Sequence, residues 1–416
     1  MRRLISHRDA RIYIAGQSFS VVGDSALWLA MAIWVKILTG SNSAAGLTFL
    51  AFVCGCMTAP LSGMVVDRLR RRPLLIAANL GGAVLVCALL LVGGRGQVWL
   101  VYAVMFGYGA ANGLLTAGQT ALLTDLVPGD LLGEANAALQ MVSQGLRLIT
   151  PLIGAGLLAW AGARPVILLD AGTFVIAAAA VFALRLREPR PAREPARWRA
   201  EFAAGIRHIA DTPALRRPLI ACLIAVSAFG LFETVPFAVV GQGLHHSPTF
   251  LGVLNSLQGA GALIGGALAA AVMRRTSERA LMAGGLAACA VATLLLITGS
   301  LPLVLVAMAG IGLCVVWINV GAITLIQRRT PGPLLGRVDA TLEFAIVVPQ
   351  AVSIAAGAAL IAAVNYRILL VAMAVVIGFA AAYLARGEAD RRAGGQTDAS
   401  AVQQADSMPR ESAGTL

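Results

Sequence analysis

Long apolar stretches alternate with short polar segments along most of the chain. A membrane-spanning helix needs about 20 mostly apolar residues, and stretches of this kind recur about twelve times. The pattern therefore predicts an all-α membrane protein with twelve transmembrane helices. We expect them at about Ile12–Leu38, Ala44–Val66, Leu74–Val92, Val98–Leu123, Ala137–Trp160, Pro165–Leu184, Leu219–Val240, Phe250–Met273, Leu281–Ile297, Leu301–Ile326, Val338–Val364 and Ile368–Ala385.

Composition and charge agree with this class. Hydrophobic residues make up 58% of the chain and charged residues only 12%, whereas about 25% of residues are charged in a typical soluble domain. The net charge of +12 does not indicate a nucleic-acid partner, because the arginines are spread over short loops, as a topology signal is. The partner that the composition predicts is the lipid bilayer. The six cysteines all fall inside apolar stretches, without a spacing typical of disulfides or metal ligands.

The arginines predict the orientation of the chain in the membrane. With the N-terminus inside, the inner segments hold 27 of the 31 arginines and the outer loops hold three. Positively charged residues accumulate on the cytoplasmic side of membrane proteins. We therefore expect both termini in the cytoplasm and the protein in the cell inner (plasma) membrane.

A long polar connection divides the twelve spans into six plus six. Residues 1–11 are expected to form a cytoplasmic tail, and the next apolar run predicts an uncleaved first helix rather than a signal peptide. The first six-helix half covers residues 12–184 and the second covers 218–386. The connection, 185–217, starts as a proline- and arginine-rich linker. It continues as an amphipathic helix, expected on the inner membrane surface or as a solvated linker helix. Residues 387–416 are polar and are expected to be disordered.

The two halves share an internal repeat. The segment Leu126–Leu139 follows the fourth span and Arg329–Leu342 follows the tenth, and seven of their fourteen positions are identical. The match occurs at one constant offset and at equivalent places in the two halves. It predicts two pseudo-symmetric parallel copies, as in a transporter whose halves rock about a central site.

A charged turn lies between the second and third spans. Its sequence is Gly63-Met-Val-Val-Asp67-Arg68-Leu-Arg70-Arg71-Arg72-Pro73. Together with the twelve spans, the central loop and the repeat, this turn resembles the major facilitator superfamily, which has a signature between helices 2 and 3. Arg70 departs from that signature, which usually has a second glycine at this place. The Leu-x-Pro-x-x-Leu-Leu-Gly elements and the segment 201–209 further resemble the group of macrolide-efflux and enterobactin-exporter proteins.

The resemblance implies the major facilitator fold and a gating role for the charged turn. By this resemblance Asp67 and Arg68 form a latch with Asp125, which ends the fourth span and lies on the cytoplasmic side. A carboxylate suits the positive N-terminal end of a helix, and an arginine can pair with a carboxylate through two hydrogen bonds. The alternative is that the arginines are a topology signal only. The remaining residues of the motif are Gly63, Arg71 and Arg72.

Charged residues inside the spans are candidates for function, because a charge at the bilayer centre costs about 2.5–3.5 kcal/mol on insertion scales. Gln17, Ser20, Asp24 and Trp28 follow at steps of three and four, so they share one face of the first helix. Glu233 lies at a similar depth in the corresponding helix of the second half. We expect Asp24 and Glu233 to face a central cavity and to handle protons or substrate, because an apolar environment favours a protonated carboxyl group. The alternative for each is a structural hydrogen bond.

Arg147, in the fifth span, is a further candidate for substrate or proton handling. It is expected either to pair with a carboxylate such as Asp24 or to extend toward the interface. The sequence around it partly resembles the helix 5 signature of superfamily antiporters, in which glycines and a proline allow close packing and a bend. Thr150 replaces an expected glycine. The residues of this packing motif are Pro151, Gly154 and Gly156.

Two further carboxylates, Asp170 and Glu343, lie nearer the ends of their spans. Both are expected to reach an interface by the length of their side chains. This geometry gives them less weight as functional residues than Asp24 and Glu233.

These features predict a secondary active transporter and not an enzyme. The chain has no phosphate-binding Gly-x-x-x-x-Gly-Lys-Ser/Thr loop and no metal spacing of histidines, so no cofactor and no metal is expected. The leading hypothesis is a monomer that exports a hydrophobic or amphipathic small molecule (a drug, a macrolide or a siderophore-like compound) in exchange for protons by alternating access. One alternative is an importer or lysophospholipid flippase of the same fold. An alternative from another class is a membrane sensor or scaffold that does not transport.

Overall fold

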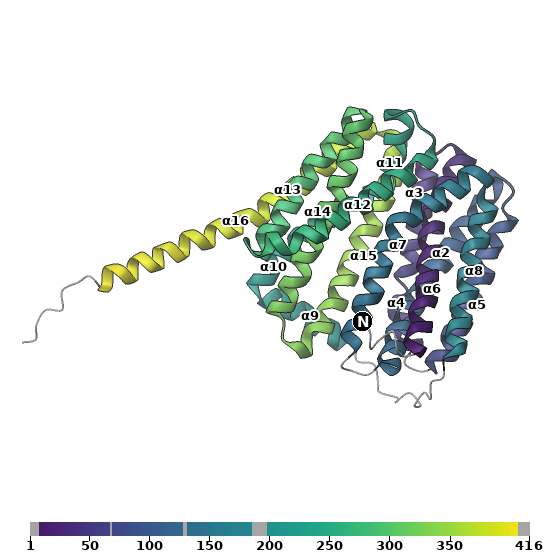
Figure 1. Ribbon diagram of the computed structural model, residues 1–416. Coiled ribbons are helices and arrows are strands. Elements are labelled where there is room, and N and C mark those ends of the chain that lie inside the picture. Colours follow the sequence, from purple (N-terminus) through teal and green to yellow (C-terminus); the bar gives the residue numbers. More distant parts are fainter. Residues whose placement is uncertain (1–7, 67–68, 128–130, 185–197, 407–416) are drawn as a thin grey trace, which may run out of the picture.

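The computed structural model describes residues 8–66, 69–127, 131–184 and 198–406. Helices of the first half occupy the purple to teal part of the chain in Figure 1. They are α2 (Arg8–Thr39), α3 (Asn42–Cys56), α4 (Ala59–Val66), α5 (Arg71–Cys87) with the 3₁₀ segments η1 (Ala88–Leu91) and η2 (Arg95–Gln97), α6 (Val98–Leu126), α7 (Leu132–Ala161) and α8 (Ala163–Ala183).

The second half follows a short connecting helix, α9 (Trp198–Asp211). Its first helical run is broken into several pieces: α10 (Pro213–Phe229), the 3₁₀ segment η3 (Gly230–Glu233), α11 (Val235–Ala238) and the π-helical segment η4 (Val239–Gly243). The other elements are η5 (Pro248–Phe250), α12 (Leu251–Met273), α13 (Glu278–Leu295) with η6 (Leu296–Thr298), α14 (Leu301–Arg329), α15 (Gly332–Ala363) and α16 (Tyr366–Asp406).

The predicted fold class is confirmed. Ten helices of the described ranges are long and apolar enough to cross a membrane. Two shorter apolar helices, Asn42–Cys56 and Ile149–Ala161, coincide with the second and fifth predicted spans. The second span is interrupted between the end of α3 at Cys56 and the start of α4 at Ala59. Pro60 has no N–H to continue the helix across this point.

The segments at the ends of the second half differ in part from the expectation. The predicted amphipathic helix is present as α9, and Ile209 packs against a buried cluster that includes Leu215, Leu325 and Val338, so α9 rests on the second half. α16 continues as a helix through Asp406 and leaves the bundle in Figure 1, whereas a disordered tail was expected from residue 387. Alanine, arginine and glutamine in this segment favour a helix. Residues 407–416 and 185–197 lie outside the described ranges.

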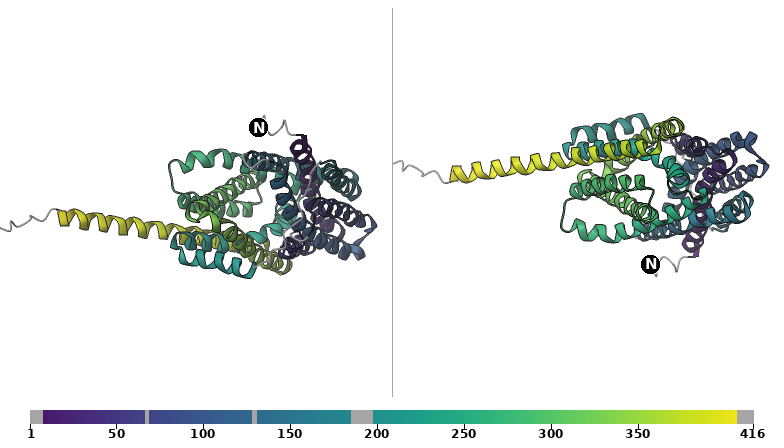
Figure 2. Two further views of the ribbon diagram at one scale, coloured as in Figure 1. Left: turned by 90° about the horizontal axis from the view of Figure 1, so that it is seen from below. Right: turned by 90° about the horizontal axis from the view of Figure 1, so that it is seen from above.

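The two halves are built by the same packing of helices. In the first half α2 packs on α7 and α8, α3 on α6, and α5 on α6 and α8. In the second half α10 packs on α15 and α16, α12 on α14, and α13 on α14 and α16. Seen along the helices in Figure 2, the two halves lie side by side. This arrangement agrees with the repeat found in the sequence.

Glycines allow equivalent helices to cross closely in both halves. A side chain at Gly109 of α6 would collide with the backbone of Phe52 in α3, and a side chain at Gly312 of α14 would collide with the backbone of Gln258 in α12. Gly109 and Gly312 are related by the same offset that relates the repeated segments. Small residues permit such close backbone approach inside a membrane.

The halves meet along two helix pairs, α3 with α15 and α7 with α12. A Cβ at Gly46 of α3 would lie 3.3 Å from the Ala358 Cβ of α15, and one at Gly252 of α12 would lie 2.5 Å from the Ala155 Cβ of α7. These close approaches lie toward the ends of α3, α7, α12 and α15 near α11, which is far from α9 and the N-terminus in Figure 1.

Candidate functional site

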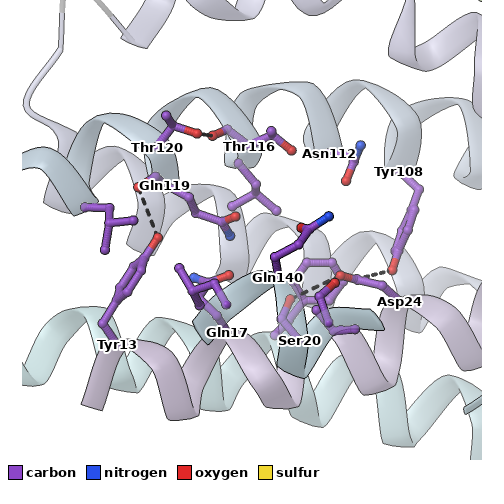
Figure 3. A pocket seen from close by; sticks show the side chains of 16 residues that line it. Tyr13, Gln17, Ser20, Asp24, Tyr108, Asn112, Thr116, Gln119, Thr120 and Gln140 are labelled. Atoms are coloured by element: carbon purple, nitrogen blue, oxygen red, sulfur yellow. Dashed lines mark hydrogen bonds between the residues drawn. The ribbon is translucent and has the colours of Figure 1, made fainter. Parts of the chain in front are cut away.

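A cavity of about 340 Å³ lies within the first half, between α2, α6, α7 and α8. This volume falls in the range of about 300–1,000 Å³ that is typical of ligand sites. Figure 3 shows polar side chains of α2 and α6 facing each other across it. We call it the polar cavity, and its lining residues are Tyr13, Gln17, Ser20, Val21, Asp24, Tyr108, Asn112, Leu115, Thr116, Gln119, Thr120, Leu123, Leu139, Gln140, Ser143 and Phe174.

α2 presents one polar face to the polar cavity. Gln17, Ser20 and Asp24 line it together, as their spacing predicted. Gly16 and Gly23 lie on another face, where a Cβ at Gly16 would be 2.5 Å from the Ala180 Cβ of α8. The missing side chains let α8 approach α2, and the polar residues of α2 lie on the face next to this contact.

Trp28 is not among the residues that line the polar cavity, although it was expected on the same face as Asp24. Its ring packs against Phe49 of α3, with the ring centroids 4.6 Å apart. Trp28 follows Asp24 by four residues, which is about one further turn along the helix axis. Trp28 therefore extends past the end of the cavity, toward the helices that join the two halves.

Asp24 belongs to a hydrogen-bonded cluster at one end of the polar cavity. The Ser20 hydroxyl donates to Asp24 Oδ2 at 3.3 Å, and the Tyr108 hydroxyl of α6 donates to Asp24 Oδ1. The same Tyr108 oxygen lies 3.4 Å from Oδ1 of Asp170 on α8. Two carboxyl groups from different helices thus share one tyrosine hydroxyl.

Asp170 lies deeper in the protein than its sequence position suggested. It was expected to reach an interface, but its side chain is fully buried between α2, α6 and α8. The reason is Gly23, because a Cβ there would collide with the carboxylate of Asp170 and the hydroxyl of Thr173. Glu343, by contrast, is exposed on α15.

Aromatic rings hold Tyr108 in place. Its ring meets Phe174 of α8 edge-on with centroids 5.7 Å apart, and Phe52 of α3 lies 6.0 Å away on another side. Such pairs add to the packing energy of buried rings. The tyrosine hydroxyl is therefore fixed between the two carboxyl groups by apolar contacts as well as by hydrogen bonds.

Glu233 is separate from the Asp24 cluster. It ends the 3₁₀ segment η3, where the first helical run of the second half is broken, and it does not line the polar cavity. A role for Glu233 in proton or substrate handling therefore stays a prediction. The break itself lies at the junction of the halves, because the next residue, Thr234, is buried against Gly46 of α3.

The motif expected in the fifth span takes part in two helix contacts. A Cβ at Gly154 would lie 2.5 Å from the Ala26 carbonyl oxygen of α2, and the Pro151 carbonyl lies beside Gly252 of α12. A Cβ at Gly156, in contrast, would meet no atom within 4 Å, so this glycine is not needed for a close helix contact. The side chain of Arg147, on the same helix, lies outside the described residues.

The charged turn is described only in part. Asp67 and Arg68 lie outside the described ranges, as does the environment of Gly63. The predicted pair of Arg68 with Asp125 therefore stays a prediction. Among the described residues, Asp125 forms an ion pair with Arg71, which also donates a hydrogen bond to the Ala121 carbonyl at 3.0 Å. Arg71 is the first residue of α5, so its side chain reaches the end of α6 directly.

Arg72 of the same motif contacts α8. Its guanidinium donates a hydrogen bond to the Phe182 carbonyl and lies over the Phe182 ring, 5.6 Å from the centroid. The second half has an ion pair of reversed polarity at the equivalent place, between Glu278 at the start of α13 and Arg328 near the end of α14. Both pairs join the same two helices of their half at the end where the arginines gather.

The polar face of α6 was not recognised in the sequence. Tyr108, Asn112, Thr116, Gln119 and Thr120 recur at steps of three and four, which places them on one side of the helix. This spacing was visible, but uncharged polar residues are less conspicuous than carboxylates in an apolar stretch. At the offset of the repeat, the corresponding residues of α14 are Ile311, Val315, Asn319, Ala322 and Ile323. The polar face is thus a property of the first half.

Histidine, cysteine and acidic side chains are dispersed over the described part of the chain. No three histidine, cysteine, aspartate or glutamate residues gather there closely enough to hold an ion. The six cysteines are free thiols within helices.

Two halves of membrane-length helices, with a polar cavity within the first half, are typical of a multi-pass membrane transporter. The sequence profile of the Major Facilitator Superfamily matches residues 13–245 and 219–408. The chain therefore belongs to this superfamily: it is a secondary transporter that acts on a small molecule in a membrane, and it is not an enzyme.

Similar proteins agree with this assignment. The uncharacterized MFS-type transporter y4rN of Sinorhizobium fredii is 28% identical over 325 residues, which cover 73% of this chain and 76% of that protein. Among solved structures, the POT family transporter PepTSo superimposes with a TM-score of 0.74 at 12% identity, over 93% of this chain and 98% of that one. A bacterial homologue of the iron transporter ferroportin, in an inward-facing state, gives a TM-score of 0.70 at 15% identity, over 91% and 98%. At these identities the structures share the fold alone.

Proposed function

We propose that this chain exports an amphipathic small molecule in exchange for protons, by alternating access through the polar cavity. The observation that carries the proposal is a carboxylate, Asp24, which lines a membrane-embedded cavity and is hydrogen-bonded to Ser20 and Tyr108. A charge retained at such a place is costly and marks a functional site in membrane proteins. A carboxyl group that gains and loses a proton there can link proton flow to substrate binding.

The lining of the polar cavity supports an amphipathic substrate. Glutamine, asparagine, serine and threonine side chains offer hydrogen bonds without a net charge, and Val21, Leu115, Leu139 and Phe174 provide apolar contact. A purely hydrophobic molecule would leave the polar groups without partners, which costs free energy. Macrolides and siderophore-like compounds combine both kinds of surface, in agreement with the resemblance to the macrolide-efflux and enterobactin-exporter group.

The arrangement of the halves supports transport from the cytoplasmic side. The polar cavity extends from Asp24 toward Tyr13 and Leu123, near the end where the arginines gather. The close contacts between the halves lie toward the opposite end. With the arginine-rich end in the cytoplasm, both termini lie inside and the cavity receives substrate from the cytoplasm. The proposed form of the protein is a monomer in the inner membrane.

The test uses inside-out membrane vesicles with an imposed pH gradient and a panel of macrolides and amphipathic fluorescent dyes. The unchanged chain is expected to accumulate at least one compound, and Asp24→Asn to lose this proton-driven accumulation. Asp211→Asn is the matched control, because it makes the same chemical change on the exposed surface of α9. Full accumulation by Asp24→Asn, or accumulation that ignores the pH gradient in the unchanged chain, would refute the proposal.

A further inference from the structure

A second carboxyl group, Asp170, lies behind Asp24 and does not line the polar cavity. Its side chain is fully buried. Its Oδ2 atom has no hydrogen-bond partner among the described residues, and its Oδ1 atom is 3.4 Å from the Tyr108 hydroxyl. That hydroxyl already donates its one proton to Asp24. Among the described residues, the Asp170 side chain thus has one hydrogen-bond partner, which another carboxyl group also uses.

An ionised carboxylate is poorly accommodated in such an environment. Burial removes the water that stabilises its charge, and a second carboxylate nearby disfavours the charge further. A protonated carboxyl group, in contrast, can donate to the Tyr108 oxygen and needs no counter-ion. We therefore expect Asp170 to hold a proton while Asp24 is ionised.

The groups around Asp170 come from several helices. Asp24 of α2 and Tyr108 of α6 are the described titratable groups that act on it. The titratable side chains of α5, which also packs on α8, are Arg71 and Arg72 in its first turn and Cys87 in its last. Neither arginine contacts Asp170 in the described interactions, because Arg72 donates to the Phe182 carbonyl of α8 and Arg71 pairs with Asp125 of α6. The side chains of Glu134 and Arg147 on α7 lie outside the described residues.

We propose that Asp170 is a second proton-binding residue of this transporter, connected to the cavity residue Asp24 through the Tyr108 hydroxyl. The inference rests on the proposed proton-coupled function and adds the place where the proton resides. A proton arrives from cavity water on the Asp24 carboxylate. Tyr108 Oη then accepts it from Asp24 and passes its own hydroxyl proton to Asp170 Oδ1. Asp24 becomes ionised, Tyr108 keeps one proton, and Asp170 becomes a neutral acid.

This relay separates the proton from the substrate. Asp24 is in contact with the cavity, whereas Asp170 is fully buried beside Gly23 and Thr173. A proton held on Asp170 leaves Asp24 charged and able to bind a hydrogen-bond donor or a positive group of the substrate. Return of the proton to Asp24 removes that charge and favours release of the substrate. A proton on Asp24 and a substrate bound to the Asp24 charge would then exclude each other, as exchange requires.

Infrared difference spectroscopy of the purified full chain in liposomes tests the location of the proton without a substrate. At neutral pH we expect a carbonyl stretching band of a protonated carboxyl group that shifts in D₂O and is lost in Asp170→Asn. Asp24→Asn should retain this band. Tyr108→Phe should retain it at a shifted frequency, because one hydrogen bond is lost. An unchanged spectrum in Asp170→Asn overturns the inference, and so does a sodium-dependent change in place of the band, which would assign a cation to the carboxyl pair.

Vesicle transport tests the relay. Tyr108→Phe removes only the hydroxyl and should lose the dependence of efflux on the pH gradient, with Tyr102→Phe as the matched control. Tyr102 lies on the same helix, and its hydroxyl donates to the Ala44 carbonyl at 3.0 Å, away from the carboxyl groups. If the unchanged chain shows proton coupling and Tyr108→Phe retains it in full, the relay is overturned while the proposed function stands. If the unchanged chain shows no coupling, the proposed function fails, and the infrared band still decides whether Asp170 holds a proton.

Discussion

Single residues decide how the polar cavity is built. Gly23 is one example, because it has no side chain at the point where α8 brings Asp170 and Thr173 against α2. Asp24 and Asp170 are evident in the sequence as charges within apolar stretches, but their close approach depends on this glycine. Tyr108 is a second example, since its hydroxyl joins two carboxyl groups that are 146 positions apart in Asp24 and Asp170.

A Gly23→Ala substitution tests the role of close packing at this point. The added methyl group would collide with Thr173 and Asp170, and we expect a loss of stability of about 1–3 kcal/mol, which is typical of an overpacked core. Thermal unfolding in detergent measures the loss.

Gly172→Ala is the control for this prediction. It makes the same change on the neighbouring helix, where a Cβ would meet no atom within 4 Å. Alanine has a higher helix propensity than glycine by about 1 kcal/mol, so this variant should be as stable as the unchanged chain or slightly more stable. Equal melting temperatures for Gly23→Ala and Gly172→Ala would contradict the packing argument.

At the scale of elements, the two halves share a framework but differ in their chemistry. α6 and α14 have the same length and the same close glycine crossing, at Gly109 and Gly312. Their faces nevertheless differ, because the polar residues of α6 are replaced by mostly apolar ones in α14. The repeat therefore preserves the contacts that hold the helices together, while the cavity-lining positions have diverged.

The ion pairs at the ends of these helices give a prediction at this scale. A double variant that exchanges Glu278 and Arg328 should be as stable as the unchanged chain. The reason is that a pair with reversed polarity, Arg71 and Asp125, joins the equivalent helices of the first half. Arg328→Glu alone should lower stability by less than about 1 kcal/mol, since Arg328 is largely exposed. The combination with Glu278→Arg should restore it. A double-mutant cycle on thermal unfolding measures the coupling, and additive losses in the double variant would show that the pair does not interact.

At the scale of the whole molecule, orientation follows from charge and not from the helices themselves. Arg95 lies between the third and fourth spans and Arg275 between the eighth and ninth, and both are exposed. The arginine distribution predicts that the first lies outside and the second inside. In intact cells, a membrane-impermeant maleimide should therefore label Arg95→Cys but not Arg275→Cys, which should react only after permeabilisation.

The native cysteines should contribute little background to this labelling. All six cysteines lie within helices, so the chain without an added cysteine should give low background and serves as the control. Labelling of Arg275→Cys, but not of Arg95→Cys, in intact cells would reverse the proposed orientation.

Local periodicity allowed much of the fold to be predicted. An apolar stretch of about 20 residues is a property of adjacent residues, and so are the repeat and the face shared by Gln17, Ser20 and Asp24. The helix break at Glu233 was not predicted, although Pro236 in the first turn of α11 is a local signal for it. The contact of Thr234 with Gly46, in contrast, involves a distant helix. The ion pair of Asp125 with Arg71 was not predicted either, since it depends on where α5 begins relative to the end of α6.

The sequence by itself determined the class of this protein: membrane-length apolar helices, two related halves and an arginine distribution that predicts the orientation. These features follow from the solvent that each stretch requires and from covalent order along the chain. Only the tertiary structure decided which buried charges meet. Asp24 and Asp170 are brought to one tyrosine because α2, α6 and α8 pack closely at Gly23, whereas Glu233 lies apart from them. A contact between side chains depends on the rotation and spacing of three helices, and no local pattern encodes these.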